Sequence, residues 1–126
     1  MKKSRIEVDN DVVLDWLRAQ ARGARYITSV CTGSALLAAA GILDGIRATS
    51  NKISFDWAAS QGPEVHWVRE ARWVEDGNIF TSSGVSAGID MALAVVAAVL
   101  GGNAADDAAL WAEYIRNREA DLDPFA

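Results

Sequence analysis

The sequence predicts a layered α/β fold, and two observations carry that prediction. Segments rich in β-branched residues alternate with segments that have helical periodicity, which is the pattern of strands covered by helices. The dipeptide Asp76-Gly77 lies between two alternating apolar segments and predicts a hairpin, so at least one strand pair is antiparallel. The length of 126 residues predicts one domain over residues 1–126, and 51% hydrophobic residues are enough for a core.

The first half of the chain begins with a helix and a strand. In NDVVLDWLRAQARG, residues 10–23, apolar residues recur at helical spacing, with Asn10 or Asp11 as the N-cap and Gly23 at the end. The β-branched segment RYITSV, residues 25–30, predicts a buried strand. TGSALLAAAGIL then predicts a helix, and IRATS predicts a second, short strand.

The second half contains short elements and then two long helices. SFDWAASQG, residues 54–62, predicts a short helix. Three strands are expected near residues 65–69, 72–75 and 78–82. Residues 85–101 are apolar nearly all round, so this helix is expected to be buried between other elements. Residues 103–123 predict a final amphipathic helix. Its expected core contacts are Ala109, Trp111, Tyr114 and Ile115.

Composition excludes two classes of partner. The net charge is −5 and the basic residues are scattered, which argues against nucleic-acid binding. The longest apolar segment is shorter than the roughly 20 residues that cross a bilayer, and Asp90 interrupts it, so no membrane partner is expected. One cysteine cannot form an intrachain disulfide, and the N-terminus does not resemble a signal peptide, so we expect a cytoplasmic protein.

The single cysteine, Cys31, lies where the predicted strand meets the predicted helix. Small residues two positions before and after it, Ser29 and Gly33, suit a sharply folded nucleophile elbow. At a helix N-terminus the thiol is expected to shift toward thiolate, and the Thr32 N–H is placed to donate to an oxyanion. From spacing alone, a buried inert cysteine explains the pattern equally well.

The turn at residues 83–85 and the single histidine are the other candidates for a functional site. The turn at Ser83, Gly84 and Val85 follows a strand, and ligands of open α/β sheets bind at the carboxyl ends of strands. Helix capping by Ser83 or Ser86 explains this turn equally well. The only histidine, His66, is expected on the surface of a strand, so the sequence offers no Cys-His-acid triad.

Three segments together resemble the ThiJ/PfpI superfamily, in the branch that includes isonitrile hydratases. They are YITSVCTGSALLAAAGILDGIRATS, ARWVEDGNIFTSSGVSAGIDMALAVVA and the tail DLDPFA. The resemblance implies a flavodoxin-like three-layer sandwich with a mostly parallel sheet, usually assembled as a homodimer. It also implies that Cys31 is the nucleophile or redox centre, that the Thr32 N–H lines the oxyanion site, and that the 83–85 turn packs beside Cys31. No metal or organic cofactor is expected.

Two departures from the family pattern qualify these expectations. Asn51 stands where several relatives carry histidine, so it is a candidate for substrate binding, with Gly33, rather than for acid–base work. The chain matches about the C-terminal two-thirds of the family fold. We therefore expect the opening strands, and the acidic side chain that bonds the cysteine, to be missing, and one sheet edge to be uncovered.

The resemblance leads to two functional hypotheses. The first is a hydratase or hydrolase in which Cys31 attacks a small electrophile such as an isonitrile, with turnover impaired by truncation. The alternative is a non-catalytic redox or stress sensor, or a ligand-binding module.

Overall fold

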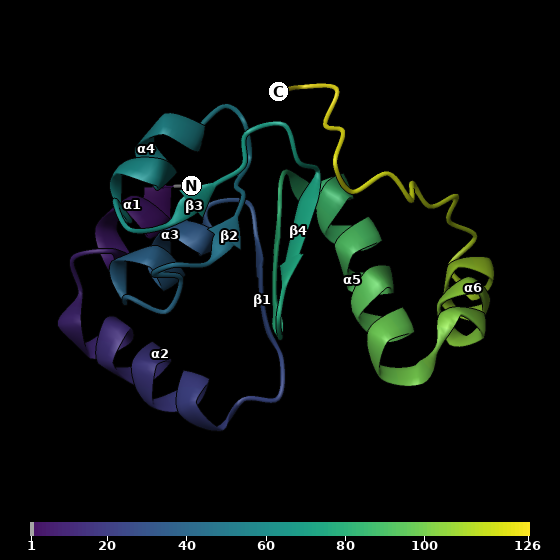
Figure 1. The fold of residues 1–126 in the computed structure, drawn as a ribbon, viewed down its shortest axis with the longest axis horizontal. Helices are drawn as coiled ribbons and strands as arrows, with labels where there is room; N and C mark the ends of the chain where they lie inside the picture. Colours follow the sequence, from purple (N-terminus) through teal and green to yellow (C-terminus); the bar gives the residue numbers. More distant parts are fainter. Residues whose placement is uncertain (1) are drawn as a thin grey trace.

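The computed structural model describes residues 2–126, in which helices and strands alternate as the sequence predicts (Figure 1). The elements are α1 (Lys2–Glu7), α2 (Asp11–Gly23), β1 (Ile27–Val30), α3 (Gly33–Ala39), β2 (Arg47–Ala48), α4 (Phe55–Ser60), β3 (His66–Trp67), β4 (Trp73–Asp76), β5 (Ile79–Ser82), α5 (Val85–Leu100) and α6 (Gly102–Trp111).

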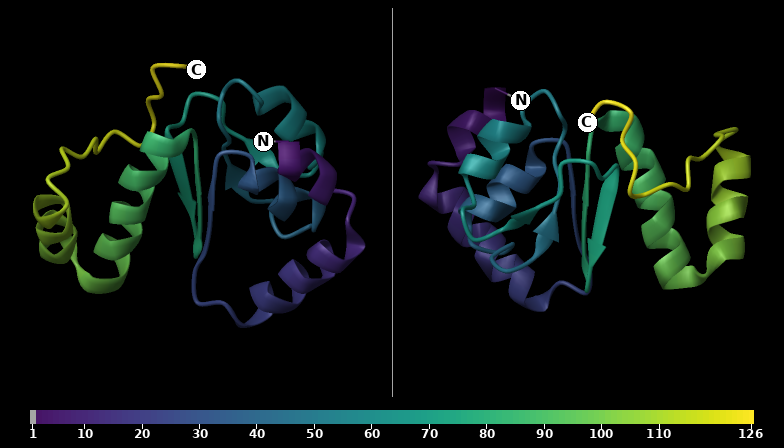
Figure 2. Two further views of the ribbon diagram at one scale, coloured as in Figure 1. Left: turned by 180° about the vertical axis from the view of Figure 1, so that it is seen from behind. Right: turned by 45° about the horizontal axis from the view of Figure 1, so that its top comes forward.

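The strands form a central sheet of order β1-β5-β4 and a separate pair, β2-β3. β1 runs parallel to β5, and β4 runs antiparallel to β5. The predicted Asp76-Gly77 hairpin joins β4 to β5, and Gly77 has a φ of 59°, which glycine adopts without steric cost. Helices α1 to α4 lie on one side of the central sheet and α5 on the other, with α6 outside α5 (Figures 1 and 2). The fold is the flavodoxin-like α/β sandwich that we predicted.

β1 is an edge strand, as expected, with β5 on one side only. In a parallel pair, every second residue directs its N–H and C=O to the neighbouring strand. Ile27 N donates to Asn78 O, so Ile27 and Ser29 face β5 while Thr28 and Val30 present their backbone groups to the open side.

The core is divided between the two faces of the sheet. On the α3 side, Leu37 and Leu43 pack with Ile79. On the α5 side, Trp73 and Phe80 pack with Met91. Ile79 and Phe80, which are neighbours on β5, therefore pack against helices on opposite faces of the sheet, which fixes the register of the strand.

Helix α1 was not predicted, because its six residues show no apolar stripe. Two contacts with later elements hold it in place. Ser4 Oγ lies 2.9 Å from Thr32 Oγ1, and the Arg5 guanidinium lies 4.3 Å from the centre of the Trp57 ring. A cation over an aromatic face is attracted by the ring quadrupole.

The last helix is shorter than predicted. α6 ends at Trp111, because Glu113 takes a positive φ of 51° and Tyr114 N donates back to Ala109 O, which closes the helix C-terminus. Ala109 is buried and Tyr114 is partly buried, as expected. Trp111 and Ile115 are 89% and 94% exposed, so the prediction that they are core contacts is wrong.

Helix α5 is also less enclosed than predicted. Its buried side includes Asp90, Met91 and Leu93, whereas Val85 and Leu100 at its ends are exposed. The helix is covered by the sheet on one side and by α6 on another, which leaves its ends open to solvent.

Candidate functional site

Cys31 lies in the short turn between β1 and α3. Its φ is 55°, a left-handed conformation that costs a non-glycine residue about 1–2 kcal/mol. The turn is held by backbone contacts on both sides. Cys31 N donates to Ser83 O at 3.0 Å, and Cys31 O accepts from Ser50 Oγ at 3.0 Å and Ser34 Oγ at 3.3 Å. Backbone strain of this kind persists only where surrounding contacts hold the residue in its conformation. Such strain is common at functional sites.

The small neighbours of Cys31 are close together in space, as the elbow interpretation requires. A Cβ atom placed on Gly33 would lie 3.3 Å from the Ser29 Cβ. The sharp turn therefore leaves little room for a larger residue at position 33. Gly33 begins α3 and does not line the pocket described next, so it supports the turn and is not placed to contact a ligand.

A pocket of about 470 Å³ opens beside Cys31. Six of the seven predicted site residues line it, namely Cys31, Thr32, Asn51, Ser83, Gly84 and Val85. They come from the turn after β1, the loop after β2 and the turn after β5. The carboxyl ends of strands β1 and β5 thus meet at one site, as they do in other open α/β sheets.

Three lining residues were missed from the sequence: Lys52, Ile53 and Phe125. Lys52 and Ile53 follow Asn51, and the position of that loop after a predicted strand could have indicated them. Phe125 belongs to the DPFA tail, which carried part of the family resemblance but had no predicted role.

The expected shift of Cys31 toward thiolate is not what the site produces. Burial raises the pKa of the Cys31 thiol above its ordinary value, and the Thr32 backbone N–H, which lowers the pKa, does not offset burial. α3 is only seven residues long, and its Thr32 N-cap makes no side-chain capping bond. The thiol is therefore predominantly neutral near pH 7, and the prediction of a depressed pKa is wrong.

Lys52 is held by oxygen atoms on several sides. Its Nζ donates to Thr49 Oγ1 and Ala71 O, both at 2.8 Å, and to Ser50 O at 3.1 Å. Asp123 Oδ2 lies 3.7 Å from the same nitrogen, and both side chains are almost fully buried. Burial lowers the pKa of Lys52, and the Asp123 carboxylate acts against that shift.

Asp123 is ionised in this environment. Burial alone would raise its pKa, but hydrogen bonds from the Ser83 hydroxyl and the Phe125 N–H, together with the charge of Lys52, hold the pKa below its ordinary value. The buried pair therefore consists of a cation and an anion whose charges offset each other.

His66 is exposed on β3 and does not line the pocket, in agreement with its predicted surface position. In residues 2–126, no three histidine, cysteine, aspartate or glutamate side chains gather as a metal site would require. Within the same residues, no helix is long and apolar enough to cross a membrane.

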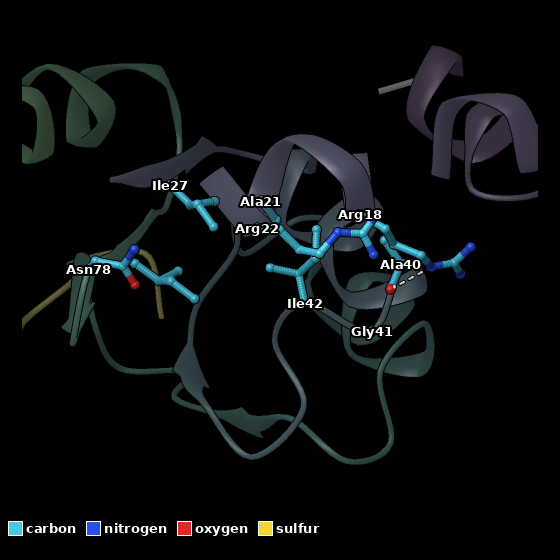
Figure 3. A pocket seen from close by; sticks show the side chains of 9 residues that line it. Arg18, Ala21, Arg22, Ile27, Ala40, Gly41, Ile42 and Asn78 are labelled. Carbon is cyan, nitrogen blue, oxygen red and sulfur yellow. Dashed lines mark hydrogen bonds between the residues drawn. The ribbon is translucent and has the colours of Figure 1, made fainter. Parts of the chain in front are cut away.

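A second pocket, of about 380 Å³, lies at the opposite end of the strands (Figure 3). It is formed by one face of α2 with Ile27, Asn78 and the segment after α3, and Arg18 Nε closes part of it by donating to Ala40 O at 2.9 Å. It lies at the amino ends of β1 and β5. The Cys31 pocket, at the carboxyl ends, is the better candidate for ligand binding.

Comparison with known families decides the classification. Residues 2–98 match the DJ-1/PfpI family. The chain belongs to the DJ-1/PfpI family. This family is the one that the sequence resemblance indicated, under its other name of ThiJ/PfpI.

Individual DJ-1/PfpI relatives include an enzyme and regulators. The chain is 43% identical over 107 residues to isonitrile hydratase of Pseudomonas putida, which covers 85% of this chain and 46% of that protein. It is 35% identical over 85 residues to the HTH-type transcriptional regulator CdhR of Pseudomonas aeruginosa, covering 68% of this chain and 25% of that protein. The chain thus spans about half the length of the hydratase and a quarter of the regulator.

Solved DJ-1/PfpI structures share the fold. A ThiJ/PfpI family protein from Pseudomonas syringae superposes with a TM-score of 0.80 at 37% identity, covering 90% of this chain and 46% of that one. Drosophila melanogaster DJ-1beta superposes with a TM-score of 0.75 at 24% identity, covering 91% of this chain and 60% of that one, and supports the fold alone.

Proposed function

We propose that this chain is a hydratase- or hydrolase-type enzyme in which Cys31 attacks a small electrophile such as an isonitrile. The observation that supports the proposal is the pocket in which Cys31 meets Thr32, Asn51 and the 83–85 turn. The 43% identity to an isonitrile hydratase favours this substrate class over other electrophiles. The chain spans 46% of that relative, so the activity of the whole relative comes to this chain only as a proposal.

The proposed reaction adds one water molecule to an isonitrile, R–N≡C. The Cys31 sulfur bonds to the terminal carbon, and that carbon gains the thiol proton through solvent, which gives the thioimidate R–N=CH–S–Cys. Water then adds to the same carbon, the C–S bond breaks, and the formamide R–NH–CHO leaves with the thiol restored. The Thr32 N–H stabilises the charge that develops while the tetrahedral adduct collapses.

The neutral thiol has a consequence for the rate. Among the described residues that line the pocket there is no carboxylate or imidazole, and the Lys52 amine is already bonded to three oxygens. Because none of these residues can act as a general base, only a small fraction of the Cys31 thiol is ionised to the reactive thiolate at neutral pH. The rate of isonitrile hydration should therefore rise with pH.

The test is formation of N-benzylformamide from benzyl isocyanide, followed by proton NMR. Turnover by the unaltered chain, lost in Cys31→Ser and retained in His66→Ala, is the expected result. His66 is the matched control, because it is exposed and lies away from the pocket. Equal rates in Cys31→Ser and the unaltered chain would rule out a cysteine-dependent reaction.

A ligand-binding module is the second candidate, and the regulators among the relatives favour it. A redox sensor receives less support, because oxidation follows thiolate character and the thiol of Cys31 is neutral. Peroxide treatment with mass spectrometry separates the two: a sensor gains oxygen atoms on Cys31 at low peroxide, whereas a binding module does not.

We further propose that the chain works in the cytoplasm as a homodimer. The single cysteine, which cannot form an intrachain disulfide, supports the setting. Light scattering coupled to size-exclusion chromatography tests the assembly, and a monomer at micromolar concentration would contradict it.

A further inference from the structure

The C-terminal tail returns from α6 to the Cys31 pocket. Figure 2 shows it leaving α6, crossing to the N-terminal end of α5 and continuing past that end to the C label. Asp123 N donates to Glu70 O at 2.8 Å, and Phe125, two residues further on, lines the pocket. The tail therefore reaches the pocket, and contacts with other segments hold it there.

The Lys52–Asp123 pair fixes the tail. The Asp123 carboxylate accepts from Phe125 N at 2.9 Å while it lies 3.7 Å from Lys52 Nζ. The Lys52 side chain is 5% exposed, and the Asp123 side chain is 2% exposed. The ion pair therefore connects the loop after β2 to the backbone of Phe125.

The same pair leaves the pocket without an uncompensated charge. Of the nine residues that line it, only Lys52 carries a formal charge, and the Asp123 carboxylate offsets that charge. An anionic ligand would find no free cation there, and a charged group that leaves water needs a partner.

Three strongly exposed apolar side chains surround this neutral pocket. Ile53, Val85 and Phe125 are 91%, 75% and 79% exposed, and they come from three separate segments. Exposed apolar residues that gather around a concave site are a mark of ligand binding.

We propose that the C-terminal tail is a working part of the Cys31 pocket, in which the Lys52–Asp123 pair positions Phe125. Phe125, Ile53 and Val85 then form an apolar wall that selects electrophiles with an uncharged, apolar substituent. The link to catalysis rests on the proposed function, whereas the selection itself is a property of binding.

Binding of two matched probes tests the proposal without turnover. The probes are N-benzylformamide and its 4-carboxybenzyl analogue, titrated by NMR. The unaltered chain should bind the benzyl probe at least about tenfold more tightly, because the carboxylate finds no free partner. Phe125→Ala should weaken the benzyl probe about fivefold. The matched control Leu122→Ala, an exposed apolar residue of the same tail outside the pocket, should change nothing.

Asp123→Asn supplies a readout that loss of packing alone would not give. It leaves the Lys52 charge uncompensated, so the carboxybenzyl probe should bind more tightly than it does to the unaltered chain. The double variant Lys52→Met with Asp123→Asn should lose that gain. Folding of each variant is checked by circular dichroism, and Phe125→Ala, which alters an exposed side chain, keeps the test available if Asp123→Asn unfolds.

The proposal is overturned if the unaltered chain binds neither probe, if it does not prefer the benzyl probe, or if Phe125→Ala behaves like Leu122→Ala. Failure of the proposed function looks different. In that case no formamide forms from benzyl isocyanide, while the binding preferences for the two probes remain.

Discussion

Replacing Asp90 by asparagine should destabilise the protein more than any surface change of the same kind. Asp90 is completely buried, and its Oδ2 accepts from Arg72 Nε at 3.1 Å and Arg72 Nη2 at 2.8 Å. Its Oδ1 accepts from Asn117 N at 2.8 Å. Asparagine keeps the shape and one oxygen, but it presents an amide N–H₂ to a guanidinium that has only donors.

The magnitude follows from the buried charge that is left behind. Breaking a buried ion pair by removing one partner costs about 3–5 kcal/mol, because the remaining charge is uncompensated. A domain of this size is expected to be stable by about 5–15 kcal/mol, so the change removes a large share of the total. With an m-value of about 2 kcal/mol/M, a loss of about 4 kcal/mol lowers the urea midpoint by about 2 M.

Urea denaturation followed by tryptophan fluorescence measures this shift. Asp15→Asn is the matched control, because Asp15 pairs with Arg18 at 2.8 Å on the surface and its loss should cost less than about 1 kcal/mol. A second variant, Arg72→Met with Asp90→Leu, removes both charges and should recover most of the loss. If Asp90→Asn costs no more than Asp15→Asn, the Arg72–Asp90 ion pair is not buried as described, and the reasoning fails.

Three other predictions follow from the structure. Alkylation of Cys31 by iodoacetamide should accelerate with pH up to a midpoint above 9.0, because burial raises the thiol pKa, and a midpoint below 9.0 would contradict this. Gly62→Ala should cost about 1–3 kcal/mol in urea denaturation, since the new Cβ would lie 2.6 Å from Val65 Cγ2 and 2.8 Å from Ala38 Cβ; an unchanged midpoint would show that the neighbours move freely. The Asp123 carboxylate should contribute its full stabilisation above pH 3.8 and lose it as the pH falls through its lower folded pKa; the stability gap to Asp123→Asn, measured against pH, should therefore close only in strong acid.

The parts of the fold that depend on local sequence were predictable. The strand before Cys31, the helix after it and the Asp76-Gly77 hairpin each have a signal within a few residues of their own position. The family resemblance implied the position of the 83–85 turn beside Cys31, and β1 and β5, the strands that precede the two turns, are indeed paired.

The features that depend on distant contacts were not predictable. The end of α6 is set by the backbone of Glu113, whereas the apolar periodicity continues past it. The direction of the Cys31 pKa shift depends on how much of the thiol the fold covers, which spacing does not reveal. The partnership of Lys52 with Asp123 joins a loop near the middle of the sequence to the tail.

The pocket draws its walls from four stretches of chain that are far apart in sequence: 31–32, 51–53, 83–85 and 125. A fragment that contains the whole site must span residues 31–125, so a ligand can bind only once these distant stretches have come together. Removal of the segment that contains Phe125 would therefore take away one wall of the pocket while leaving the Cys31 sulfur in place.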